Sequence, residues 1–238
     1  MNTYTKAGSA TTVAKVLFES GAVQIDTKVG FRLKAHDRFP DAPLSPIYLS
    51  IRPKGIKDGT LEPHHFTCLG NALAQYTKEQ KVFADWICGI PAAGEPIAEA
   101  LMRAGSGPLQ LSRETKLLKG LVSGRRRIIG VIPGNNGVIP HKEQTVLLVD
   151  DLVTNADSKL EAAAAFWGID CCVDTLLVLI DRSSNARQKL ARSGIKLHAL
   201  LTFTQLLDYG RAEGAISDLD YEVITAYPKK LAASTRRG

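Results

Sequence analysis

Residues 145–159 read Thr-Val-Leu-Leu-Val-Asp-Asp-Leu-Val-Thr-Asn-Ala-Asp-Ser-Lys, and this stretch decides the fold. Its aliphatic run at 146–149 is short and unbroken, which is typical of a strand buried on both faces of a parallel sheet. Two adjacent carboxylates, Asp150 and Asp151, stand at the carboxyl end of that strand. A short polar turn comes next, so the stretch predicts a strand, an acidic pair and a turn in that order.

The turn and the residues after it suit an anionic ligand. Ser158 and Glu161 have the spacing of a capping box, so a helix is expected to begin near Ser158. In an open α/β sheet, ligands bind outside the carboxyl ends of the strands, where helix N-termini favour anions. Turn N–H groups would hold a phosphate, and the carboxylates would hold sugar hydroxyls or metal-bound water, which suits a sugar with several phosphates and magnesium. The alternative is an acidic pair that merely starts a turn.

The bulk composition indicates an ordinary globular protein. With 238 residues, 45% of them hydrophobic and 23% charged, the chain is long enough for one α/β domain with a real core. The net charge of +6 is compatible with phosphorylated substrates and with weak nucleic-acid binding. The four cysteines form no CxxC pattern, and no apolar run approaches membrane-spanning length. A cytoplasmic protein with reduced cysteines and no membrane segment is expected.

Hydrophobic periodicity predicts strands and helices that alternate along the chain. Strands are expected at 47–51, 82–87, 109–111, 146–149, 172–180 and 196–201, and helices at 11–20, 63–76, 95–104, 159–167, 185–192 and 203–210. This alternation predicts a mainly parallel sheet with helices on both faces. The basic C-terminal tail is expected to be frayed. Residues 1–20 supply one short helix and no helix-turn-helix, so nucleic-acid binding is not expected.

Residues 113–142 show little periodicity. They carry three consecutive arginines, Arg125 to Arg127, and a turn-like Pro133-Gly-Asn-Asn-Gly137. A connection this long inside an α/β domain is more often a functional flap than an ordinary solvated excursion. Both interpretations stay open, as does the role of the arginines.

The pattern of residues 145–159 resembles the phosphoribosyl-diphosphate signature of the type I phosphoribosyltransferases. Further stretches resemble one branch of that family, the orotate phosphoribosyltransferases: residues 31–34, 45–52, 89–98, 113–116, 181–182 and 198–209. The resemblance implies the type I fold in a single domain over 1–238. It would have an N-terminal hood at about 1–55, a core at about 60–210 and a mobile loop at about 113–142.

The resemblance also implies a reaction and a set of site residues. The phosphoribosyl group of phosphoribosyl diphosphate would pass to orotate, giving orotidine 5′-phosphate and pyrophosphate, with magnesium and in a homodimer. The residues with implied catalytic roles are Arg113, Lys116, Asp150 and Asp151. The residues with implied substrate-binding roles are Lys34, Thr154, Asn155, Ala156, Asp157, Ser158 and Arg182. Among these, Arg182 would read the orotate, and the backbone of 154–158 would hold the 5-phosphate.

Three features depart from the family pattern. The loop histidine is absent, because residues 117–120 read Leu-Leu-Lys-Gly, where Leu118 offers no cation and Lys119 is the nearest substitute. The pyrophosphate loop carries Ala92-Ala93 where a Tyr-Lys pair is usual, and the phosphate turn has Ala156 and Asp157 in place of Gly and a hydroxyl residue. Lys159 is expected to offset the Asp157 charge, or Asp157 to point outward. The alternative function is therefore a catalytically impaired relative that binds a nucleotide or the donor as a sensor or subunit.

Overall fold

The computed structural model describes residues 8–37, 39–105, 113–123, 125–134, 137–183 and 185–235. The chain forms two compact units. The first, here called the sheet unit, consists of residues 63–203 with the start of the chain up to residue 13. The other, here called the second unit, consists of residues 14–62 and 204–238, so it takes in more than the expected hood. The division into hood, core and loop stays a prediction.

The sheet unit is built on six strands in the order β5-β4-β3-β6-β7-β8. They are β3 (Trp86–Gly89), β4 (Arg113–Val122), β5 (Arg125–Pro133), β6 (Thr145–Val153), β7 (Cys172–Asp181) and β8 (Lys196–Thr202). Only β4 and β5 pair antiparallel, and all other neighbours are parallel. The expected mainly parallel α/β sheet is thus confirmed.

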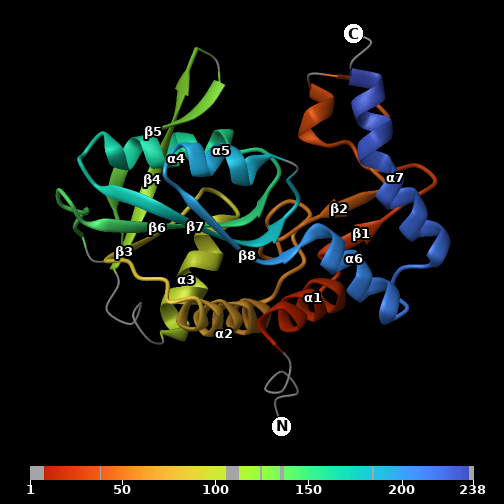
Figure 1. Ribbon diagram of the computed structural model, residues 1–238, viewed down its shortest axis with the longest axis horizontal. Coiled ribbons are helices and arrows are strands. Elements are labelled where there is room, and N and C mark those ends of the chain that lie inside the picture. Colours follow the sequence, from red (N-terminus) through yellow and green to blue (C-terminus); the bar gives the residue numbers. More distant parts are fainter. Residues whose placement is uncertain are drawn as a thin grey trace. The chain divides into compact units, whose positions relative to one another are not determined.

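Helices cover both faces of this sheet (Figure 1). On one face lie α2 (Pro63–Glu79) and α3 (Gly94–Ala104), and on the other α4 (Asp157–Trp167) and α5 (Ala186–Arg192). The central strand β6 is buried from Val146 to Val149, with exposures of 0–1%. Its unbroken aliphatic run is therefore explained by apolar layers on both sides of it.

The strands that follow β3 along the chain are added on both sides of it in the sheet. The strand that follows β3 along the chain, β4, lies on one side of it, whereas β6 lies on the other side. Such a reversal leaves a crevice outside the carboxyl ends of the two strands, because the connections diverge there. The crevice between β3 and β6 is therefore where the fold predicts a ligand.

Residues 113–133 form a β-hairpin, which corrects the prediction of an aperiodic segment. Strands β4 and β5 pair from Thr115↔Pro133 to Val122↔Arg125, with a bulge between Leu118 and Lys119. The bulge and the polar residues interrupt the alternation of polar and apolar side chains that is typical of a strand. The sequence pattern therefore did not indicate a strand here. The hairpin widens the sheet at its β5 edge. The brief strand predicted at 109–111 lies outside the described residues.

Other boundaries also differ from the prediction. Strand β3 begins at Trp86, four residues later than expected, and β6 continues to Val153. The acidic pair thus lies within β6, where Asp150 pairs with Val178 of β7. Parallel pairing with a long neighbour extends the strand past its apolar run.

The second unit joins segments from both parts of the chain. It contains β1 (Val23–Ile25) antiparallel to β2 (Ile47–Leu49), the 3-10 helix η2 (Lys34–Asp37), and most of α1 (Ser9–Glu19), α6 (Phe203–Ala212) and α7 (Asp218–Thr235). The sequence predicted a frayed C-terminal tail, but helix α7 continues to Thr235, so this prediction is wrong up to that residue. Ile224 and Tyr227 of α7 are buried, because they pack inside this unit.

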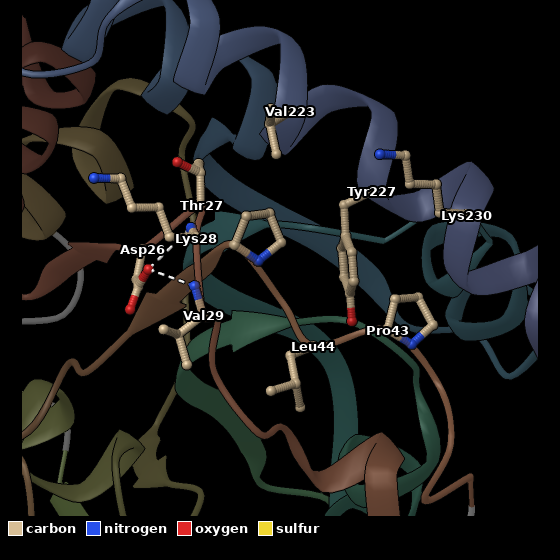
Figure 2. A pocket seen from close by; sticks show the side chains of 11 residues that line it. Asp26, Thr27, Lys28, Val29, Pro43, Leu44, Val223, Tyr227 and Lys230 are labelled. Carbon is tan, nitrogen blue, oxygen red and sulfur yellow. Dashed lines mark hydrogen bonds between the residues drawn. The ribbon is translucent and has the colours of Figure 1, made fainter.

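A hydrogen bond and a cavity lie between the two segments of the second unit. The Thr27 hydroxyl donates to Asp220 Oδ1 at 2.7 Å. A cavity of about 240 Å³ is lined by Asp26, Thr27, Lys28, Val29, Gly30, Pro43, Leu44, Pro46, Val223, Tyr227 and Lys230 (Figure 2). It includes none of the site residues predicted from the sequence. Across the described part of the chain, no helix combines the length and apolarity needed to span a membrane.

Candidate functional site

The loop after β3 packs closely against the end of β6. Ile90 N–H donates to the Val149 carbonyl at 2.8 Å, and Gly94 N–H donates to the Ile90 carbonyl at 2.9 Å. A Cβ atom on Gly94 would collide with the Val149 carbonyl and lie 3.2 Å from Asp150 Oδ1. Glycine at 94 therefore lets the first turn of α3 approach the acidic pair. This is the loop that resembles a pyrophosphate loop.

The acidic pair is held tightly at the crevice. Asp150 is 5% exposed, and its Oδ1 accepts the Asp151 N–H at 2.9 Å. Its Oδ2 accepts from Lys159 Nζ at 2.6 Å. Burial raises the pKa of Asp151 well above the usual range, and the charge on Asp150 raises it further. The two carboxylates therefore favour an added proton or an added cation.

The expectation that Lys159 offsets the Asp157 charge is wrong, whereas the alternative that Asp157 points outward is confirmed. The Lys159 ammonium lies inside the protein on Asp150, whereas Asp157 is exposed and pairs with Lys189 Nζ of α5 at 2.5 Å. The Asp157 carboxylate is thus neutralised by a neighbouring helix. This contact removes the repulsion that an aspartate in the phosphate turn would otherwise cause.

The phosphate turn accommodates its alanine without strain. Ala156 is fully buried and has φ −88° and ψ −4°, so the position needs no glycine. The backbone N–H groups of Thr154, Asn155 and Ala156 have no hydrogen-bond partner among the described residues. They precede the first turn of α4, where the helix dipole favours an anion. The turn can therefore still receive a phosphate.

The predicted capping box at the start of α4 does not form. The helix begins at Asp157 after Ala156, with no side-chain cap. Glu161 instead accepts the Ile128 N–H of β5 at 3.2 Å and pairs with Arg127 Nη1 at 3.6 Å. The glutamate is used to hold the hairpin, which the sequence spacing alone does not reveal. Arg127 thus has a structural contact to α4.

Two lysines of β4 lie beside the loop after β3. Lys119 Nζ donates to the Pro91 carbonyl at 2.5 Å. Burial raises the pKa of Glu95 in α3, and the charges of Lys116 and Lys119 lower it, which places both ammonium groups near that carboxylate. The hairpin therefore brings cations to a loop whose own sequence is Ala92-Ala93.

The remaining predicted residues differ in their positions. Arg113 pairs with Trp86 at the amino end of the parallel strands, with its guanidinium 5.8 Å from the Trp86 ring, so it lies away from the acidic pair. Arg182 follows β7 at the carboxyl end, where its N–H donates to Val153 O at 2.9 Å and its guanidinium stacks 4.6 Å from the Phe203 ring. The side chain of Lys34 lies outside the described part of the structure.

The donor set suits a hard cation such as magnesium. Two adjacent carboxylates, Asp150 and Asp151, offer the oxygen ligands that magnesium prefers, and a cation would relieve their repulsion. Among the described residues, no three or more His, Cys, Asp or Glu side chains gather into a metal-binding group. A cation here would thus keep several ligands from water or substrate.

Comparisons with known proteins agree with this geometry. No family model matches the sequence. The chain is 29% identical to an orotate phosphoribosyltransferase of Methanoculleus marisnigri over 196 residues, which cover 82% of this chain and 97% of that protein. It is 27% identical to the uridine 5′-monophosphate synthase of Bos taurus over 164 residues, which cover 68% of this chain and 31% of that protein.

Solved structures show the same fold. The UMP synthase of Leishmania donovani superposes with a TM-score of 0.69 at 23% identity, over 92% of this chain and 42% of that one. The chain thus spans less than half the length of the two synthases and nearly all of the archaeal transferase. The chain is thus similar to orotate phosphoribosyltransferases in sequence, and it has the type I phosphoribosyltransferase fold.

Proposed function

We propose that the chain transfers the phosphoribosyl group from phosphoribosyl diphosphate to orotate, giving orotidine 5′-phosphate and pyrophosphate. The observation that carries this proposal is the convergence of the acidic pair, the turn at 154–156 and the Gly89–Gly94 loop at one crevice. Sequence similarity to orotate phosphoribosyltransferases along most of the chain supports the choice of base. The reaction belongs to pyrimidine nucleotide synthesis.

Each part of the crevice has a task in this reaction. The N–H groups of Thr154 to Ala156 bind the 5-phosphate, and the Asp151 carboxylate accepts a hydrogen bond from a ribose hydroxyl. The bond from the sugar C1 to diphosphate breaks, and its electron pair leaves with the diphosphate oxygen. An orotate ring nitrogen that has lost its proton to solvent supplies the pair for the new bond. Lys116 and Lys119 stabilise the charge on the departing diphosphate.

Arg182 is the proposed orotate-binding residue. It lies one strand from the acidic pair, and its guanidinium lies over the Phe203 ring, 4.6 Å from the ring centroid. A planar guanidinium suits a carboxylate, because it can donate two parallel hydrogen bonds. Lys34 is proposed to contact the donor, on the resemblance alone. Arg113 is not part of this proposal, since it lies at the opposite end of the strands.

We also propose that magnesium binds with the donor, near Asp150 and Asp151. When bound, it supplies positive charge to the diphosphate of the donor. The side chains contribute by holding oxygen atoms toward it, with water completing its ligands. The paired carboxylates and the raised pKa of Asp151 support this proposal, because they favour a positive charge nearby.

Turnover of orotate with phosphoribosyl diphosphate and magnesium tests the proposed function. The wild-type protein should consume orotate and release pyrophosphate in equal amounts. Arg182→Gln should raise the KM for orotate by about tenfold or more, because a charge-assisted pair is lost, while the KM for the donor changes little. Donor binding without orotate consumption would favour the sensor function instead.

A homodimer in the cytoplasm completes the proposal. The hairpin exposes large apolar side chains, with Leu121 76% and Ile129 52% exposed, which suits association. The four cysteines form no CxxC pattern, which supports a reducing compartment. Light scattering should give twice the chain mass, and Leu121→Lys should shift the protein toward monomer. An unchanged mass in this variant would exclude the hairpin as the interface.

A further inference from the structure

Lys159 occupies a position that stability alone does not favour. Its ammonium is buried, with the side chain 9% exposed, and lies in the first turn of α4. Burying an ammonium costs free energy, and a cation near a helix N-terminus opposes the helix dipole. An apolar residue at this position would avoid both costs. The ion pair with Asp150 therefore points to a role in the site.

The contacts of Lys159 link the phosphate turn to the acidic pair. Its backbone N–H donates to the Ala156 carbonyl at 3.1 Å, which connects the first turn of α4 to the phosphate turn before it. Its side chain reaches back to Asp150 Oδ2 at 2.6 Å. One residue thus ties the backbone that would bind the 5-phosphate to the carboxylate beside the ribose.

The negative charges at the crevice would oppose an anionic donor unless a cation such as Lys159 offset them. A donor with three phosphate groups would approach Asp150 and Asp151, and like charges would oppose its binding. The Asp157 carboxylate nearby is neutralised by Lys189, which leaves Lys159 as the cation that contacts the acidic pair among the described residues. Its ammonium cancels the Asp150 charge before any ligand arrives.

We propose that Lys159 is a positioning residue of the donor site, which holds the Asp150 carboxylate in place and offsets its negative charge beside the turn that would receive the 5-phosphate. This inference rests on the proposed function for the identity of the ligand. It predicts that phosphate affinity at the turn depends on Lys159 even without a metal ion. A merely structural lysine would affect folding and leave ligand affinity unchanged.

Ribose 5-phosphate in magnesium-free buffer is the probe, because it contains the sugar and the 5-phosphate without the diphosphate. Calorimetry on Lys159→Met should show binding weakened by about tenfold or more, and Lys159→Arg should lose less. The affinity of Lys159→Met should also depend less steeply on salt, since a fixed charge has been removed. Lys15→Met, which removes an exposed ion pair with Glu19 in α1, should bind as the wild type does.

A double variant separates the ligand effect from folding. Asp150→Asn with Lys159→Met removes both buried charges, so it should fold even if Lys159→Met alone does not. It should still bind ribose 5-phosphate weakly. Wild-type affinity in the double variant or in Lys159→Met would overturn the inference, as would a wild-type protein that binds no ribose 5-phosphate.

Failure of the Lys159 inference and failure of the proposed transferase reaction give different experimental results. A wild-type protein that binds ribose 5-phosphate through Lys159 but consumes no orotate contradicts the transferase reaction and leaves the inference standing. Orotate turnover with equal ribose 5-phosphate affinity in the wild type and Lys159→Met contradicts the inference alone.

Discussion

At the scale of single residues, the site depends on charges whose partners are set by tertiary structure. The sequence located Asp150, Asp151 and the turn, because an aliphatic run followed by two acids is a local pattern. It paired Lys159 with the wrong carboxylate, because Asp150 and Asp157 lie within nine residues of it and only the fold decides between them. Local spacing therefore finds the groups and tertiary packing assigns their partners.

Asp85 gives a pH-dependent prediction at this scale. Its Oδ2 accepts the Thr145 N–H and hydroxyl, both at 2.8 Å, and these bonds lower the pKa of Asp85. A lowered carboxyl pKa stabilises the fold above the unfolded value of about 4, and this stability is lost as the pH falls through the folded value. Asp85→Asn should lower the free energy of unfolding by about 1 kcal/mol at pH 7, a modest value because Asp85 is exposed.

Denaturant unfolding at pH 7 and pH 3 measures this effect. The difference between wild type and Asp85→Asn should shrink at pH 3, because the Asp85 carboxyl is then largely protonated in the unfolded chain and its ionised form stabilises the fold less. Asp41→Asn, at an exposed aspartate, is the control. An equal difference at the two pH values would contradict the assignment.

Lys119 gives a second residue-scale prediction, for donor binding. Its contact with the Pro91 carbonyl places an ammonium on the loop that is expected to receive the diphosphate. Lys119→Ala should raise the KM for phosphoribosyl diphosphate about tenfold while the KM for orotate changes little. Steady-state kinetics with each substrate varied measures both, and Lys78→Ala on α2 is the control. An equal rise in both KM values would argue against a specific role.

At the scale of elements, the β4–β5 hairpin is the part that the sequence predicted least well. Its exposed side chains mix basic residues with apolar ones such as Leu121 and Ile129, and the bulge between Leu118 and Lys119 shifts the alternation partway along β4. No period-2 pattern therefore marks the whole strand. The parallel strands β6 and β7 were predicted well, since burial on both faces leaves an unbroken aliphatic signal.

Glu161 provides the element-scale prediction, because it connects α4 to the hairpin. Glu161→Ala removes the acceptor of the Ile128 N–H and the partner of Arg127. Hydrogen exchange of the Ile128 amide should speed up about fivefold to tenfold, which corresponds to about 1 kcal/mol of local stability. Amides of β7, which does not contact Glu161 in this way, serve as the internal reference. Unchanged exchange at Ile128 would show that the hairpin is held by other contacts.

At the scale of the whole molecule, the alternation of strands and helices predicted the α/β class, and the sheet order supplied the crevice. The sequence did not predict α7, because its buried positions, such as Ile224 and Tyr227, are few and its first turn is acidic. A helix stabilised mainly by contacts with distant segments leaves a weak local signal.

Removal of α7 tests how the second unit is stabilised. A chain ending at residue 212 lacks the Asp220 acceptor of Thr27 and the buried side chains of α7. Limited proteolysis should then cut between residues 20 and 62 much faster than in the full chain, while the sheet unit stays resistant. The Thr27→Val variant should show a smaller effect in the same direction. Equal protection of residues 20–62 in the truncated chain would mean that α7 contributes little.

The composition of the second unit from residues 14–62 and 204–238 has a consequence for synthesis. The sheet unit is nearly continuous along the chain, so its parallel strands can pair soon after residue 203 has been made. The Thr27–Asp220 contact closes over 193 residues, and the second unit must wait for its final helix to leave the ribosome. The first segment therefore stays exposed through most of translation, and the unit that the chain begins early is the one it completes last.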